Sequence, residues 1–396
     1  MKDVYICYAR RTAIGKFGGS LLPYNAGKIL SFLLKDVVET TGIDPKVIGD
    51  VKAGCCLEPI QEMNVARVAT LLAGYPIEVP AMTIDRVCTS AMEAIRSGMV
   101  DIQAGYADVV LAGGVEAMSN VPYFLPDARW GARLQNKEML CGIMEGLHAG
   151  SKAFDKTGYL MGETAERVAD KYGITREEMD EAALRSHNNA ERATNEGRFK
   201  DEIVPVPVKT RRKEYVFDKD EHFRPGLTIE ALQRLPPVFR KDGRVTAGNA
   251  SGINDGAALT LLTTKDRAEE LGLPLLAKIV AVGIAGNDPQ YMGVGPIYSV
   301  PDALKRASMK MTDVDLVECN EAFASPYVAC AKELKWDFDA TNVNGSGIGL
   351  GHPVGCTGAR IVVTLVHEMR KRGVTHGLAT LCGGGGVSEA IIVENV

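Results

Sequence analysis

The sequence predicts an α/β protein made of two similar halves, with a long insert in the first half. Short apolar runs alternate with helical patterns over residues 1–120, and the alternation returns over residues 271–396. An offset of 266 residues carries Val51 in one apolar run onto Val317 in another. Alternating strands and helices are typical of a parallel sheet covered by helices. A repeat at a fixed offset indicates a duplicated βαβ domain.

The elements of the first half follow from the spacing of apolar residues. Strands are expected at 4–7, 51–54 and 109–114, where apolar residues cluster between turn residues. One helix is expected at 27–40. Another should begin after Cys88, because apolar residues recur there every three or four positions: Met92, Ile95, Met99 and Ile102.

The second half repeats this order. Strands are expected at 278–282, 315–320 and 379–384, with helices beginning at Pro301 and after Pro353. Residues 121–247 break the alternation and carry aromatic, proline and charged residues. We expect an inserted loop domain there, placed over one face, where it binds substrate. The first half is then 1–120, completed by 248–270.

Composition narrows the functional classes. The chain has 396 residues, is 46% hydrophobic and carries a net charge of −5, with one short basic run at Arg211-Arg212-Lys213. This charge pattern argues against a nucleic-acid or membrane surface and favours a small-molecule substrate. Nine cysteines without paired spacing indicate neither a metal site nor a disulfide framework, so we expect reduced cytosol. We find no export signal and no apolar run long enough to span a membrane.

Cys88 is a candidate nucleophile. It precedes Thr89 and Ser90, two residues that favour a helix N-terminus. Backbone N–H groups and the helix dipole stabilise a thiolate at such a position, so we expect a lowered pKa for the Cys88 thiol. The alternative is a buried structural cysteine, since free cysteines are common in protein cores.

Two glycine-rich segments carry further candidates. His352 lies in the run 345–353, whose constrained backbone suits a positioned acid or hydrogen-bond donor. The alternative reading of this run is a phosphate or dinucleotide cradle, although the G-x-G-x-x-G order after a strand is absent. Cys382 ends an apolar run and precedes four glycines, whose N–H groups can face a developing oxyanion. A strand-to-turn junction is the alternative for Cys382, and a turn or cap is the alternative for Asn320.

These residues lie in segments that resemble the thiolase family over the whole chain, namely 86–95, 158–166, 245–256, 320–324, 345–353 and 382–386. The resemblance implies the thiolase fold, with two duplicated halves in a five-layered α/β/α/β/α core. It implies that Cys88 is the nucleophile and that His352 activates it. His352, with a water held by Asn320, would bind the thioester oxygen. Cys382 would be the acid/base, and the Gly384 N–H would form a second oxyanion hole with that of Cys88.

The resemblance also implies coenzyme A contacts. Ser251 would bond the pantetheine and Arg224 would pack by the nucleotide, with further wall residues at Leu160, Met161, Met292, Ala247 and Phe323. The chain departs from the family at four places: Asp85 replaces Asn, Ala91 replaces Gly, Leu160 stands where acetoacetyl-CoA thiolases commonly carry His, and Val387-Ser388 replaces Met-Gly.

The implied activity is the reversible CoA-dependent cleavage or condensation of a short 3-oxoacyl-CoA through an S-acyl-cysteine, with CoA as substrate and no cofactor or metal. The rivals are a thiolase of broader chain length, a decarboxylating condensing enzyme, and a non-catalytic acyl-CoA-binding protein. The second cysteine and Ser251 disfavour the condensing enzyme. A homodimer or homotetramer in the cytoplasm is expected.

Overall fold

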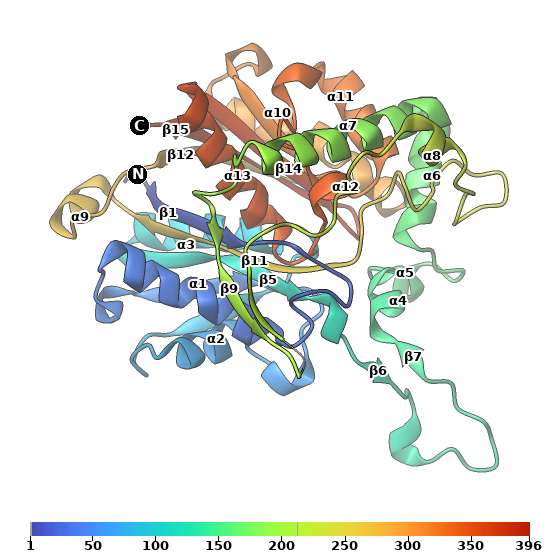
Figure 1. The fold of residues 1–396 in the computed structure, drawn as a ribbon, viewed down its shortest axis with the longest axis horizontal. Coiled ribbons are helices and arrows are strands. Elements are labelled where there is room, and N and C mark those ends of the chain that lie inside the picture. The colour runs from blue at the N-terminus through green and yellow to red at the C-terminus, as the bar shows by residue number, and fades with distance from the viewer. Residues whose placement is uncertain (1, 212) are drawn as a thin grey trace.

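One hydrogen-bonded sheet runs through both halves of the chain in the computed structural model, which describes residues 2–211 and 213–396 (Figure 1). Arg212 of the short basic run lies outside the described residues. In the first half the strands follow the spatial order β4 (Ala81–Ile84), β3 (Asp50–Gly54), β5 (Val109–Ala117), β11 (Asn254–Thr263) and β1 (Tyr5–Thr12). In the second half the order is β12 (Ala277–Gly286), β15 (Val387–Asn395), β14 (His376–Gly383) and β13 (Leu316–Cys319).

The strand order confirms the duplication. In the first half β1 pairs antiparallel with β11, β11 pairs antiparallel with β5, and β5 pairs parallel with β3, the fourth strand in this order. In the second half β12, β15, β14 and β13 pair in the same order and the same directions. Val51 on β3 and Val317 on β13 both occupy the fourth strand, as their offset predicts. The halves join where Tyr5 and Ile6 of β1 pair with Lys278 and Ala277 of β12.

The expectation of a parallel sheet is wrong for one strand in each half. β11 and β15 run antiparallel to both neighbours. The reason is clearest at β15, which follows β14 after only the three residues 384–386. A connection that short can join only antiparallel strands, because a parallel crossover needs a dozen or more residues.

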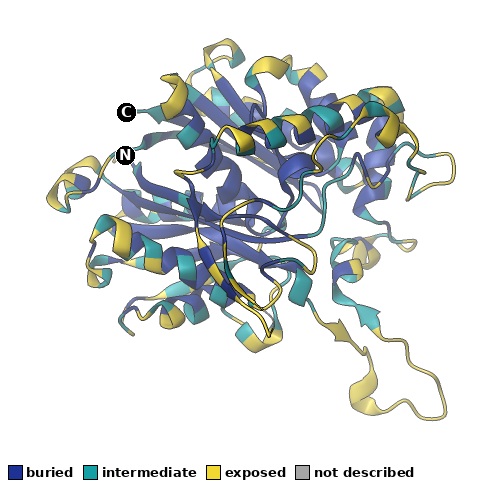
Figure 2. Cartoon of the chain, viewed as in Figure 1, coloured by how far each residue is buried: buried dark blue, intermediate teal, exposed yellow. Residues whose placement is uncertain are grey.

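Helices and sheets form the five expected layers. Two helices, α3 (Ser90–Ala104) and α13 (Thr357–Arg372), lie between the two halves of the sheet and contact each other. The outer face of the first half carries α1 (Ala26–Thr41) and α2 (Val65–Ala73). The outer face of the second half carries α10 (Pro296–Ala307) and α11 (Ala324–Leu334). Figure 2 shows the strands and the middle helices as mostly buried.

Alternating side chains explain how one strand joins two layers. On β15, Ile391 and Val393 pack with the middle helices, while Ala390 and Ile392 pack with the outer layer. Successive strand residues point to opposite faces, so a sheet covered on both sides needs an apolar run rather than an apolar-polar alternation. Burying both faces stabilises the fold by about 25 cal/mol per Å² of apolar surface removed from water.

One helix begins earlier than expected. α10 starts at Pro296, not at Pro301, which lies inside it. Proline is favoured in the first turn of a helix, because the N–H it lacks has no helical partner there. The sequence contains both prolines, and Pro296 marks the true start.

The insert is made of several parts that contact different regions of the molecule. It begins with a projecting arm whose base is the short pair β6 (Tyr123–Phe124) and β7 (Leu140–Cys141), followed by α4 (Gly142–Gly146) and α5 (Ser151–Phe154) (Figure 1). The long helices α6 (Met161–Tyr172) and α7 (Arg176–Asn195) then pack against α11 of the second half. The insert therefore forms both a projecting arm and a pair of helices that cover part of the second half.

The rest of the insert returns to the first half. There β8 (Ile203–Val204) pairs parallel with β1, and β9 (Val206–Lys209) forms a hairpin with β10 (Glu214–Phe217) ahead of α8 (Ile229–Gln233). The remaining short elements are β2 (Gly15–Lys16), α9 (Lys265–Glu270) and α12 (Gly347–Leu350). None of the helices in the described part of the chain combines the length and apolar character of a membrane crossing.

Candidate active site

Cys88 lies on a strained turn at the start of α3. The preceding residue, Val87, has a φ of +51°. A β-branched side chain is a rare occupant of that left-handed region, and such strain persists only where the surroundings hold it. Ser90 holds this turn, since its hydroxyl accepts the Arg86 N–H at 2.8 Å and donates to the Val87 carbonyl. Asp85, where the family has Asn, accepts the Val87 N–H at 2.8 Å.

The expected lowering of the Cys88 pKa is wrong. Burial raises the pKa of this thiol to about 11, and the carboxylates of Glu116 and Asp85 raise it further. The N–H groups of Gly384 and of Cys88 itself act in the opposite direction, but they do not overcome the burial. Desolvation disfavours the charged form of any group, and here it outweighs the helix N-terminus. Cys88 is therefore a thiol at neutral pH and needs a base.

His352 lines the same cavity as Cys88 and is the candidate for that base. Its backbone N–H donates to Oδ1 of Asn254 at 3.0 Å, and its ring Nδ1 lies 2.7 Å from Oγ1 of Thr357. Burial lowers the pKa of His352 to about 3, assisted by the charge of Arg360. The imidazole is therefore neutral at physiological pH, and a neutral imidazole carries one nitrogen that can accept a proton.

Asn320 lies behind His352 and not on the cavity wall. It follows β13, and its backbone N–H donates to the Thr380 carbonyl at 3.0 Å. Its Nδ2 lies 3.4 Å from both ring nitrogens of His352, while its Oδ1 has no partner among the described residues. The amide thus contacts the imidazole without favouring either nitrogen. A buried oxygen without a partner is a place where a water can bind.

Cys382 and Gly384 face Cys88 from the second half. Cys382 is buried near the end of β14, and burial together with the charge of Cys88 raises its pKa to about 12. The Gly384 N–H hydrogen-bonds the Cys88 sulfur. A side chain at Gly384 would collide with Cβ of Ala149. Glycine there lets a backbone donor approach the nucleophile closely.

The departure at Val387-Ser388 is accommodated beside Cys382. Ser388 pairs with Cys382 across the hairpin, is buried, and donates its hydroxyl to the Leu381 carbonyl at 2.9 Å. Its Oγ also lies 2.7 Å from that of Ser299. The Ser388 hydroxyl is therefore hydrogen-bonded, and Ser388 lies beside Cys382 rather than on the cavity wall.

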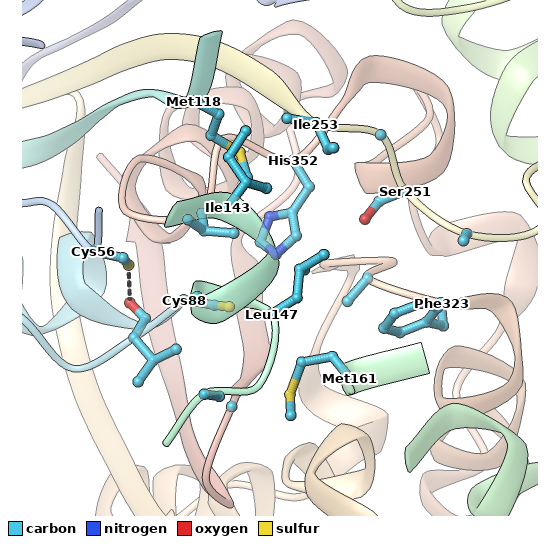
Figure 3. A pocket seen from close by; sticks show the side chains of 18 of the residues that line it. Cys56, Cys88, Met118, Ile143, Leu147, Met161, Ser251, Ile253, Phe323 and His352 are labelled. Carbon is cyan, nitrogen blue, oxygen red and sulfur yellow. Dashed lines mark hydrogen bonds between the residues drawn. The ribbon is translucent and has the colours of Figure 1, made fainter. Parts of the chain in front are cut away.

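An apolar cavity of about 280 Å³ joins these groups (Figure 3). Nine of the twelve predicted residues line it: Cys88, His352, Cys382, Gly384, Ser251, Ala247, Met161, Met292 and Phe323. Figure 3 shows Cys88 and His352 near the middle of the view, with Ser251 and Phe323 to their right. Such a pocket, apolar with a few convergent polar groups, is typical of a small-molecule site.

Two of the predicted coenzyme A contacts do not line the cavity. Leu160 is the residue before α6 and is only half-buried, with Met161 taking the wall position. Arg224 is exposed, and its backbone N–H donates to Nδ1 of His187 at 3.3 Å. The first residue of α6, Met161, is therefore part of the wall and the residue before it is not, which sequence spacing does not reveal.

Sequence reasoning missed a buried carboxylate that joins the two halves of the site. Glu116 on β5 accepts N–H groups from Cys56 at 2.9 Å, Leu57 at 3.1 Å and Gly355 at 2.8 Å. Burial raises the pKa of this carboxyl, and the three N–H donors oppose that rise. Gly355 follows His352 closely in sequence, so Glu116 positions a cavity wall and the histidine segment together. A glutamate inside an otherwise apolar strand run was the available signal.

Further wall residues were also missed, and all are apolar side chains from segments distant in sequence: Leu57, Met118, Ile143, Leu147, Val238, Phe239, Ile253 and Val354. Apolar residues in loops carry no distinguishing pattern in sequence. The described residues contain no group of three or more His, Cys, Asp or Glu side chains placed to hold a metal ion.

Comparison with known proteins agrees with this geometry. Residues 4–266 match the thiolase N-terminal domain and residues 273–395 match the thiolase C-terminal domain. The chain is 45% identical over 395 residues to the acetyl-CoA acetyltransferase of Syntrophomonas wolfei, and 46% identical over 393 residues to that of Pseudomonas aeruginosa. Each alignment covers 99% of both chains.

Solved structures give the same result. The chain resembles the Bacillus anthracis acetyl-CoA acetyltransferase with a TM-score of 0.97 at 48% identity. It resembles human mitochondrial 3-ketoacyl-CoA thiolase with a TM-score of 0.96 at 38% identity. Both comparisons cover 100% of this chain and 99% of the other. With its two cysteines, its histidine and its duplicated fold, this chain belongs to the thiolase family.

Proposed function

We propose that this protein is an acetyl-CoA acetyltransferase, which joins two acetyl-CoA molecules into acetoacetyl-CoA and CoA or catalyses the reverse thiolysis. One observation carries the proposal: the Cys88 and Cys382 thiols and the neutral imidazole of His352 line a single apolar cavity. A binding protein needs no such set, whereas acyl transfer through a thioester needs a nucleophile and an acid/base.

The first half-reaction forms the acyl-enzyme. His352 takes the proton from the Cys88 sulfur, and the thiolate attacks the acetyl-CoA carbonyl. The resulting oxyanion is stabilised by the protonated His352 and by a water at the free Oδ1 side of Asn320. The carbon–sulfur bond to CoA breaks, and the departing CoA thiolate takes a proton from Cys382. Acetyl-Cys88 and a Cys382 thiolate remain.

The second half-reaction makes the carbon–carbon bond. The Cys382 thiolate takes a proton from the α-carbon of a second acetyl-CoA, and the carbanion attacks the acetyl-Cys88 carbonyl. N–H groups of Cys88 and Gly384 are the donors we assign to this second oxyanion. The Cys88 sulfur leaves and recovers its proton from His352. Splitting the condensation in two replaces one hard step with two easier ones.

We assign the coenzyme A path to the mouth of the cavity. Ser251 and Ala247 line it there, with their side chains partly or fully exposed, as a pantetheine chain entering from solvent requires. Exposed Arg224 remains our assignment for a nucleotide contact, because a guanidinium suits phosphate geometry. Coenzyme A acts as a substrate in this scheme, and no other cofactor is invoked.

The acyl chain is proposed to be short. Met161, Met292 and Phe323 occupy the cavity wall, and the volume is at the small end for a ligand site. A broader chain length is the competing assignment, since the human mitochondrial 3-ketoacyl-CoA thiolase also resembles this chain. A series of kcat/KM values over 3-oxoacyl-CoA lengths separates the two. Acetoacetyl-CoA should be preferred, and a better 3-oxohexadecanoyl substrate would rule out the short-chain assignment.

The activity itself is tested with acetoacetyl-CoA and CoA. Loss of the enolate absorbance should depend on both substrates, and intact-mass analysis after acetyl-CoA treatment should find one acetyl group on Cys88. Absence of turnover alongside measurable acyl-CoA binding would instead indicate the non-catalytic carrier.

We further propose that the chain acts as a homodimer or homotetramer in the cytoplasm. Large apolar side chains are exposed on the arm at Tyr123, Leu125, Trp130 and Leu134, and others lie near the edge strand β4 at Ile77 and Met82. Exposed apolar patches of this kind are typical of surfaces that contact another chain.

A further inference from the structure

The environment of the His352 ring contains a hydrogen-bond chain that the reaction scheme above does not use. Nδ1 of His352 lies 2.7 Å from Oγ1 of Thr357, and the same Oγ1 donates to the Pro353 carbonyl oxygen at 2.9 Å. All three residues are buried. Thr357 begins α13, five residues after His352, so the helix start brings its hydroxyl back to the ring.

The number of protons available decides which tautomer fits. A threonine hydroxyl has one proton, and a carbonyl oxygen can only accept. If Nδ1 carries the ring proton, Nδ1–H donates to Oγ1 and the hydroxyl donates to Pro353, so both short contacts contain a hydrogen. If Nε2 carries it, the single hydroxyl proton must serve Nδ1 and Pro353 together. One of the two contacts would then be an unbonded pair of acceptors in a buried site, which is costly.

The other neighbours of the ring do not select a tautomer. Asn320 lies at 3.4 Å from both nitrogens, a longer and equal distance. Asn254 binds the His352 backbone rather than its ring. The Pro353 carbonyl already accepts N–H groups from Cys356 and Thr357, so it presents only an acceptor to the hydroxyl. The hydroxyl of Thr357 is thus the group that distinguishes Nδ1 from Nε2.

We propose that Thr357 is a positioning residue that holds neutral His352 with its proton on Nδ1, leaving the Nε2 lone pair to receive the Cys88 proton. This deepens the proposed function and rests on it. When the S–H bond of Cys88 breaks, the proton forms the Nε2–H bond, and Nδ1–H stays bonded to Thr357. The same Nε2–H then faces the thioester oxygen. A histidine in the other tautomer presents Nε2–H to a thiol and accepts nothing.

The test compares Thr357→Val, which keeps the shape and removes the hydroxyl, with Thr357→Ser, which restores it. Thr260→Val is the matched control, because Thr260 is buried and its hydroxyl donates to the Ala112 carbonyl at 2.8 Å, away from the cavity. Thr357→Val should slow Cys88 acetylation and lower kcat by about 10–100-fold, the span known for groups that orient metal-bound histidines. KM should be unchanged, and Thr357→Ser and Thr260→Val should stay near the wild-type rate.

A spectroscopic readout decides the tautomer independently of activity. In protein labelled with ¹⁵N-histidine, with His352 assigned by a His352→Gln variant, Nδ1 of the wild type should carry the proton and Nε2 should not. Thr357→Ser should keep this pattern. A proton on Nε2 in the wild type would overturn the proposal, and so would wild-type acetylation in Thr357→Val.

The two failures can be told apart. If acetyl-CoA does not acetylate the wild type, the proposed function fails while the nitrogen spectrum still tests the tautomer. If Thr357→Val does not fold, the wild-type spectrum and the Thr357→Ser rate still decide the matter, since a slow Thr357→Ser with a mixed tautomer contradicts the role of the hydroxyl.

Discussion

At the scale of single residues, the site holds Cys88, the proposed nucleophile, as a thiol. Burial raises the pKa of Cys88 to about 11 and that of Cys382 to about 12, while it lowers the pKa of His352 to about 3. All three pKa shifts favour the neutral form of the group, because a desolvated cavity disfavours every charge. The resting site is therefore neutral. Charge arises only when a proton moves between these groups or when substrate brings a donor or acceptor.

This resting state predicts how Cys88 responds to pH. The thiolate is the form that alkylates. The rate of Cys88 modification by iodoacetamide should therefore rise about tenfold per pH unit without a plateau below pH 9, since the thiolate fraction grows until pH passes the pKa. Peptide mass analysis reports the rate, with Cys88→Ser as the control for other thiols. A plateau near pH 7 would mean that the N–H donors outweigh burial.

Cys382→Ser should separate the two half-reactions. Cys88 can still be acetylated, but the α-carbon loses its base, and a hydroxyl is far weaker in that role than a thiolate. Overall condensation should fall by about 10²–10⁴-fold, the usual span for removing an acid–base group. Single-turnover acetylation and α-proton exchange of acetyl-CoA are measured side by side. Exchange at the wild-type rate would leave Cys382 only a structural role.

At the scale of elements, the site depends on how closely the strands let helix α3 and the histidine segment approach. Gly54 on β3 and Gly114 on β5 face the start of α3 and the Gly355 carbonyl. A Cβ on Gly114 would overlap that carbonyl oxygen and lie 2.6 Å from Cβ of Ala91. Ala91, where the family has Gly, therefore fits only because the strand opposite it carries no side chain.

Gly114→Ala should consequently push α3 and the histidine segment apart. Overpacking of this kind costs about 1–3 kcal/mol. We expect a lower midpoint of thermal unfolding together with slower Cys88 acetylation. Gly286→Ala is the control, since its Cβ would meet nothing closer than the Gly386 carbonyl at 3.8 Å. If both variants have the same unfolding midpoint and the same acetylation rate, the contact between β5 and α3 relaxes without loss of stability.

At the scale of the whole molecule, the duplication divides the chemistry between the halves. The first half supplies Cys88 on a strained turn, and the second supplies His352, Asn320 and Cys382. α3 and α13 begin side by side in the middle layer, so two helix starts and their preceding loops meet at one place. Two copies of one βαβ plan thereby build a single site that neither copy contains.

Substitutions of exposed apolar residues on the arm should change the oligomeric state of the protein and leave its folding stability unchanged. Trp130 is 81% exposed and Leu134 fully so, which means that neither stabilises its own chain. Replacing both, as Trp130→Ala with Leu134→Asp, should lower the mass measured by light scattering and leave the unfolding midpoint unchanged. Tyr106→Ser, at a residue 86% exposed after α3, is the control. An unchanged mass would exclude the arm from the contact between subunits.

The sequence alone predicted part of the secondary structure, the duplication and three candidate site residues. The apolar runs and helical spacings placed six strands of the main sheet and the helices α1, α3 and α13, and the 266-residue offset indicated the duplication. The six strands are β1, β3, β5, β12, β13 and β14. Local chain chemistry is enough for this, because the period of apolar residues directly reflects a helix or strand face. Cys88, His352 and Cys382 were candidates because they stand beside glycines, caps and strand ends, and the resemblance to the thiolase family implied their roles.

Only the tertiary structure showed the features that depend on contacts between distant segments and on exclusion of solvent. The sign of the Cys88 pKa shift follows from burial in a cavity that distant segments close, and no local feature reports it. The role of Glu116 depends on donors from two other segments, and the absence of Leu160 from the wall depends on how α6 begins. The antiparallel direction of β11 likewise follows from pairing with β5, a strand far along the chain. Desolvation, close approach and strand pairing are properties of the folded neighbourhood, so only the structure determines them.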